Sequence, residues 1–187
     1  YHTPIFWILM AFSTFIYPIQ AGVSLHQAPL LIARGITPGI AAFAVGSFSL
    51  MAAVAGIAFG QLETRFGVYR SLAVAALFMT MGSALMLFIS TTWTAFLSAI
   101  IFGAGIGGLL TLLPVAWANS FGREHLGSIR GITMPVQILA QASGPIISGM
   151  LFDQTGTYDA SLVLYCFFGI ISSILALVAI KYRNIGP

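Results

Sequence analysis

Polar side chains recur along one face of the first long apolar segment, and their types suit contact with a small solute. The spacings between them are four, three, four and three residues, which puts all of them on one side of a helix. They are Ser13, Tyr17, Gln20, Ser24 and Gln27. Such a stripe predicts either the wall of an aqueous cavity or a hydrogen-bonded contact between helices. We favour the cavity wall, because the stripe extends over four turns.

A second set of amides lies in a later apolar segment. Gln137 and Gln141 are four residues apart and therefore stack on one helical face. Their amides donate and accept hydrogen bonds but carry no charge, which suits a neutral, zwitterionic or hydrogen-bonding solute. Pro135 and Pro145 free backbone carbonyls on either side and loosen the helix near that face. The candidate solute-binding residues are Tyr17, Gln20, Ser24, Gln27, Gln137 and Gln141.

His26 is the one ionisable side chain clearly inside an apolar segment. An imidazole titrates near neutral pH, so His26 is a candidate proton-linked residue. The alternative, which we weight more heavily, is a neutral imidazole that is hydrogen-bonded to a neighbouring helix. No Cys/His cluster and no Ser/His/Asp set stands out, so we expect no metal site, no cofactor and no catalytic residue.

The amino-acid composition indicates whether water or lipid surrounds these segments. Only 7 Lys+Arg and 4 Asp+Glu occur in 187 residues, and 59% of the residues are hydrophobic. A soluble domain of this length would carry roughly a quarter charged residues. The balance excludes a soluble globular domain, a disordered chain and a nucleic-acid partner. It predicts an all-α membrane helix bundle with lipid as a partner.

Six apolar runs of membrane-spanning length follow one another along the chain. They cover residues 5–33, 38–60, 71–89, 93–118, 129–151 and 161–180, and we expect residues 1–187 to form one six-helix bundle. Thr37 followed by Pro38 is a helix-start signal. Because the chain begins at Tyr1 in an apolar stretch, we expect it to be part of a longer protein.

Basic residues gather on one side of this topology. Six of the seven bases fall in the alternate connections and the tail, namely Arg65, Arg70, Arg123, Arg130, Lys181 and Arg183. The other connections hold Arg34, Asp153 and Asp159. The positive-inside rule therefore predicts that both ends are cytoplasmic, in the cell (inner or plasma) membrane.

The connection over residues 61–70 carries the most specific motif. Gly60, Arg65, Gly67 and Arg70 form a glycine-bracketed basic turn, which could be an ordinary cytoplasmic turn or a conformational gate. Together with Leu62 they resemble the signature G-x-L-x-D-R-x-G-x-R-R of the major facilitator superfamily. Thr64 stands in place of its aspartate, and Tyr69 in place of one base. In the family that aspartate helps to latch one conformation.

The resemblance extends over the whole chain. Residues 119–131 are similar to the segment before the family's eleventh helix, and residues 144–158 are similar to the end of that helix in the monocarboxylate and oxalate–formate branch. Residues 38–60 and 133–151 contain no Lys or Arg, so the resemblance does not carry a carboxylate substrate to this chain. It implies the C-terminal half of a secondary transporter, a symporter or antiporter.

The implied mechanism is alternating access, with an N-terminal six-helix half as the partner. The main alternative is a self-sufficient six-helix protein that acts as a homodimeric carrier or channel. An integral-membrane enzyme is a remote alternative, since only His26 could serve it at membrane depth.

Overall fold

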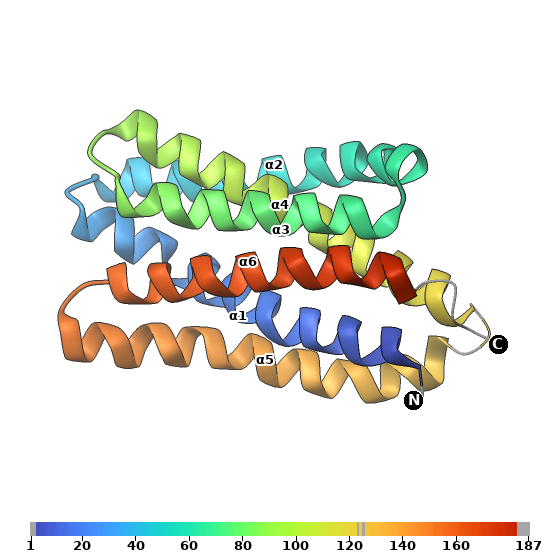
Figure 1. The fold of residues 1–187 in the computed structure, drawn as a ribbon. Coiled ribbons are helices and arrows are strands. Elements are labelled where there is room, and N and C mark those ends of the chain that lie inside the picture. Colours follow the sequence, from blue (N-terminus) through green and yellow to red (C-terminus); the bar gives the residue numbers. More distant parts are fainter. Residues whose placement is uncertain (1–2, 123, 125, 183–187) are drawn as a thin grey trace.

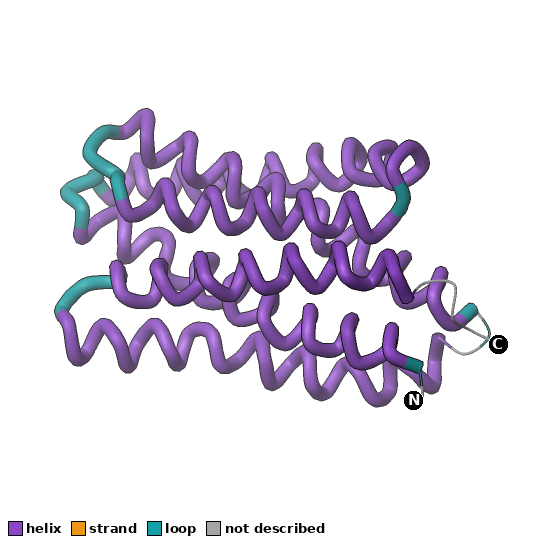
Figure 2. The backbone as a smooth tube through the Cα atoms, viewed as in Figure 1, coloured by secondary structure: helices purple, strands orange, loops and turns teal. Residues whose placement is uncertain are grey.

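The computed structural model describes residues 3–122, 124 and 126–182, and it is all-helical over these ranges. Six helices follow one another with short connections (Figures 1 and 2). They are α1 (Pro4–Ala33), α2 (Pro38–Phe66), α3 (Val68–Leu87), α4 (Thr92–Phe121), α5 (Leu126–Thr155) and α6 (Asp159–Tyr182). The predicted all-α bundle of six helices is confirmed.

Several helices are longer than the apolar runs that predicted them. α2 continues to Phe66, so most of the connection expected at residues 61–70 is helical. Residues 61–66 contain no helix breaker, and the helix stops only at Gly67, whose φ of 84° is open to glycine at little cost. α5 likewise begins at Leu126 and ends at Thr155. Hydropathy marks the part of a helix that lies in lipid, whereas the helix itself extends into the polar zones on both sides.

The helix starts follow the predicted signals in part. Pro38 occupies the first turn of α2 and Thr37 is its N-cap, but the Thr37 hydroxyl makes no capping hydrogen bond. A capping box occurs instead at α4, where Thr91 accepts from the Thr94 backbone N–H and the Thr94 side chain bonds back to Thr91. α1 runs through Pro18 and Pro29 without ending.

The helices alternate in direction, so α1, α3 and α5 run from one end of the bundle to the other and α2, α4 and α6 return (Figure 1). In space, each helix packs mainly against its neighbours in the order α5, α1, α6, α3, α4, α2. α1 packs on α5 and α6 in the same way that α4 packs on α2 and α3. The main contacts are therefore unchanged if α1 is exchanged with α4, α2 with α5 and α3 with α6. The contact between α3 and α6 joins the group of α1, α5 and α6 to the group of α2, α3 and α4.

Glycines allow the tightest of these contacts. A Cβ atom added at Gly107 of α4 would lie 2.9 Å from the Gly56 backbone nitrogen of α2. A Cβ at Gly144 of α5 would lie 2.9 Å from the Gly22 nitrogen of α1. In both places one helix backbone lies directly against another, as small residues permit in membranes.

The two ends of the bundle differ in charge. The end that holds the turn between α2 and α3 carries Arg65, Arg70 and Lys181, while Arg123 and Arg183 lie outside the described residues. At the opposite end, Arg34 pairs with Asp159 and also donates to the Leu87 carbonyl at 3.1 Å. This ion pair, the only one among the described residues, ties the end of α1 to α3 and α6.

Five of the six helices are long and apolar enough to cross a membrane, and the protein is an integral membrane protein. α5 is the exception among them: it is 30 residues long but carries too many polar side chains to meet the same criterion. Polar groups in a helix of this kind need partners other than lipid.

Candidate functional site

The polar stripe of α1 does not face one environment. Ser13 is fully buried and donates to the Leu9 carbonyl of its own helix at 2.8 Å. Tyr17, Gln20 and Ser24 are half-buried, whereas Gln27 is only 1% exposed and lies inside the bundle. The middle of the stripe is therefore the part that can reach a solute, and the structure separates Gln27 from it.

Two polar atoms in the middle of the stripe lack a partner. The Gln20 Oε1 and Ser24 Oγ atoms are buried, and no group of the described chain hydrogen-bonds to them. A buried polar atom without a partner costs free energy, which is why such atoms are rare. Both atoms therefore have hydrogen-bonding capacity that the described chain does not use.

The amides of α5 lie beside this stripe. α1 and α5 run in the same direction and touch along their length (Figure 1). The Gln137 Nε2 atom donates to the Ser13 hydroxyl at 3.5 Å, and Gln141 lies one turn further along. Both glutamines are half-buried. The structure therefore joins the two stripes that the sequence singled out into one polar surface.

Arg130 belongs to the same surface, although the sequence analysis placed it in a connection. It lies in the second turn of α5, seven and eleven residues before Gln137 and Gln141, and shares their helical face. Its guanidinium is exposed and interacts electrostatically with Tyr17 of α1. The predicted run 129–151 already contained Arg130, so its spacing of seven and eleven residues from the two glutamines was the signal that could have revealed it.

His26 is held within the bundle. Its Nδ1 atom lies 3.1 Å from the Gly22 carbonyl, which can only accept, so Nδ1 carries the proton in the neutral ring. The ring also packs against Tyr158 of the turn before α6, with centroids 5.1 Å apart. The hydrogen bond thus stays within α1 and does not reach a neighbouring helix as predicted, and it leaves Nε2 as the acceptor.

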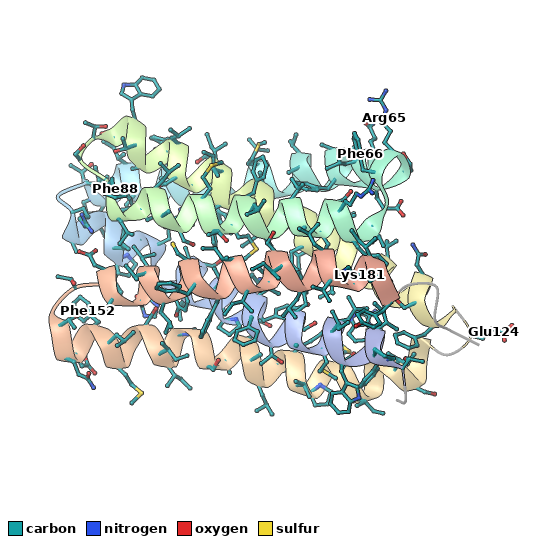
Figure 3. All side chains as sticks on the ribbon, in the orientation of Figure 1. Arg65, Phe66, Phe88, Glu124, Phe152 and Lys181 are labelled. Carbon is teal, nitrogen blue, oxygen red and sulfur yellow. The ribbon has the colours of Figure 1, made fainter. Side chains whose placement is uncertain are left out.

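The basic turn is a single-residue connection. Gly67 alone separates α2 from α3, Gly60 is within α2, and Arg65 and Arg70 are exposed at this end of the bundle. Figure 3 shows Arg65 pointing away from the helices. Thr64, in the place of the signature aspartate, donates to the Gln61 carbonyl at 2.8 Å and so contacts its own helix. A carboxylate latch at this position is therefore absent from the described turn.

Two open faces of small residues escaped the sequence analysis. On α2 an exposed or half-buried stripe, the α2 stripe, consists of Gly39, Ala42, Gly46, Ser49, Ala53 and Gly60. On α5 the corresponding α5 stripe consists of Gly127, Gly131, Pro135, Ala142 and Gly149, and it is interrupted by one large exposed residue, Ile138. A Cβ added at any of their glycines would meet nothing within 4 Å. Helical spacing of small residues was the signal that could have found both.

Large apolar side chains are also exposed on the same two helices, most of them toward one side of the stripes. Phe43, Leu50 and Ile57 project from α2, and Leu139 and Ile146 project from α5. These are the groups expected to face lipid. Each of these two helices therefore exposes both large apolar groups suited to lipid and small residues that let another helix approach closely.

Comparison with known proteins agrees with this arrangement. The family model described as the Major Facilitator Superfamily matches residues 6–186. Monocarboxylate transporter 12-B of Danio rerio is 28% identical over 165 residues, which are 84% of this chain and 34% of that protein. Monocarboxylate transporter 12 of Rattus norvegicus is 38% identical over 74 residues, covering 40% of this chain and 15% of that protein.

A solved structure shares the fold. The crystal structure of an auto-inhibited POT family peptide transporter superposes with a TM-score of 0.77 at 13% sequence identity, covering 95% of this chain and 37% of that one. The chain thus spans about a third of the length of the proteins that it matches over most of its own length. With six membrane-length helices, paired small-residue faces and a family match over nearly its whole length, the chain belongs to the major facilitator superfamily, a family of transporters.

Proposed function

We propose that this chain is the C-terminal half of a secondary transporter, which moves a small polar solute by alternating access. The observation that carries the proposal is the pair of exposed stripes rich in small residues on α2 and α5, together with the polar surface formed by α1 and α5. Glycine and alanine on an exposed helix face give little to lipid but let another helix approach closely. An N-terminal six-helix half is the covering layer that fits them.

The composition of α5 supports the same arrangement. α5 is less apolar than the other five helices, and its amide face is better satisfied by water or protein than by lipid. A second half placed on the α2 and α5 stripes would close a cavity over Tyr17, Gln137 and Gln141. In this proposal Gln20 and Ser24 line the same cavity, and Arg65 and Arg70 contribute to the gate on the cytoplasmic side.

The solute is proposed to be neutral or zwitterionic and rich in hydrogen-bonding groups, since amides and hydroxyls dominate the polar surface. A second candidate is a monocarboxylate, in line with the names of the matched relatives. Arg130 favours it, because a guanidinium on the face of Gln137 and Gln141 can pair with a carboxylate.

Uptake by the full-length protein in proteoliposomes tests the solute surface. Gln141→Ala should weaken apparent solute affinity roughly 2- to 13-fold, from about 0.5–1.5 kcal/mol per hydrogen bond. Ile146→Ala, on the apolar flank of the same helix, serves as the matched control. Arg130→Gln should reduce uptake of monocarboxylates more than uptake of neutral solutes. Equal behaviour of Gln141→Ala and Ile146→Ala would remove α5 from the solute path.

Crosslinking distinguishes the two-half transporter from the homodimer. A cysteine at Ala142, in the α5 stripe, should crosslink to introduced cysteines in the other half of the same chain, leaving the mass of a single chain on a gel. A product of twice that mass would instead support the homodimeric carrier or channel.

A further inference from the structure

A small cavity lies inside the bundle, away from the solute surface. It has a volume of about 10 Å³ and is lined by residues of α1, α3, α5 and α6 and of the turn before α6. Its walls combine apolar groups such as Met86 with the polar side chains of His26, Gln27 and Ser161. A space of about 10–15 Å³ is what one water molecule requires.

Gln27 lines this cavity with a buried amide that has no hydrogen-bond partner in the described chain. The residue is 1% exposed, yet neither Nε2 nor Oε1 of its amide hydrogen-bonds to any group of the described chain. A covering N-terminal half cannot reach it, because α1 itself and its neighbours in this chain bury it. The partner of the amide must therefore occupy the cavity.

The neighbouring hydroxyl groups have already used their hydrogens. Tyr165 donates to the Gly144 carbonyl at 2.6 Å, so Ser148, which lies 2.8 Å from the Tyr165 oxygen, is the donor in that pair. Ser161 donates to the Tyr158 carbonyl at 2.7 Å. These hydroxyls keep acceptor capacity but have no hydrogen left for the Gln27 carbonyl oxygen.

Water matches this pattern of donors and acceptors. It can accept from the Gln27 N–H or donate to the Gln27 carbonyl oxygen, and it can donate a hydrogen to an acceptor such as the Ser161 oxygen or the His26 Nε2 atom. A cation of similar size could not accept from the amide, and none of the described side chains that line the cavity is acidic. Two to four polar partners are what a buried water normally has.

We propose that the Gln27 amide holds one structural water in the cavity between α1, α3, α5 and α6. The water completes a polar link from Gln27 and His26 of α1 to Ser161 of α6. It joins these helices into one layer in the part of the bundle near the Arg34–Asp159 pair. This site is independent of the proposed transport function.

Radiolytic footprinting of the full-length protein tests the site, because X-ray pulses split bound water into hydroxyl radicals that oxidise adjacent side chains. Met86 lines the cavity and is 0% exposed, while Met79, two turns earlier on α3, is equally buried but does not line it. Mass spectrometry should find Met86 converted to the sulfoxide and Met79 left intact.

Gln27→Met removes the amide while conserving its volume, and it should abolish the oxidation of Met86. Ser161→Ala, which removes a candidate acceptor, should reduce it. The comparison of Met86 with Met79 in the unaltered protein decides the matter even if a variant does not fold. The proposal would be overturned if Met86 were as unreactive as Met79, or if both methionines were oxidised to the same extent. It would also be overturned if Met86 were still fully oxidised in a folded Gln27→Met protein.

Discussion

Gly144→Ala should destabilise the protein by forcing α1 and α5 apart. The added Cβ would lie 2.9 Å from both the Gly22 nitrogen and the Pro18 carbonyl carbon, where ordinary contacts begin at 3.4 Å. Both are backbone atoms, so no change of side-chain rotamer relieves the overlap. Overpacking of this kind costs about 1–3 kcal/mol. The better helix propensity of alanine offsets at most about 1 kcal/mol of that cost.

The measurement is the thermal unfolding midpoint of the full-length protein in detergent. Ile146→Ala is the control, since it changes the same helix on its exposed apolar flank. The Gly144→Ala midpoint should be lower than that of the control, and solute affinity should fall as well, because Gln137 moves with α5 away from Ser13. A Gly144→Ala protein as stable as the unaltered protein would refute the direct backbone contact of α1 and α5.

The remaining predictions concern the turn, the core and the topology. Gly67→Val should lower the unfolding midpoint, because a β-branched residue at φ 84° costs at least about 1–2 kcal/mol; an unchanged midpoint would contradict that backbone geometry. Tyr165→Phe should cost about 1–3 kcal/mol in unfolding experiments, since it leaves the Gly144 carbonyl and the buried Ser148 hydroxyl without their partner. In intact cells a membrane-impermeant thiol reagent should label a cysteine at Thr157 but not one at Thr64, both of which are exposed; the reverse pattern would invert the proposed orientation.

The helices could be predicted because each contains an apolar run long enough to cross a bilayer. Their ends could not, because residues such as those at 61–66 are polar without being helix breakers, and hydropathy cannot distinguish a polar helical turn from a loop. The sequence pointed to both Gly60 and Gly67 as turn glycines, and the positive φ of Gly67 shows that the helix ends there and not at Gly60.

The surroundings of the polar stripe on α1 could not be predicted from the sequence. Spacing placed Gln20, Ser24 and Gln27 on one helical face, and the structure keeps them there. What that face meets depends on where α3 and α6 pack, and these helices bury Gln27 while leaving Gln20 and Ser24 nearer the open side. Periodicity along one helix carries no information on its neighbours, so the division of the stripe was not predictable.

The unusual polarity of α5 bears on how the protein enters the membrane. Insertion of a helix from the translocon depends on its apolar content, and α5 is the one helix here that falls short of membrane-span hydropathy. α6 follows after only three residues and is strongly apolar. α5 is therefore expected to enter together with α6 as a hairpin. Its packing partner α1 is synthesised more than 90 residues earlier. The polar stripe of α1 is therefore expected to remain incompletely covered in the bilayer until α5 and α6 have been inserted.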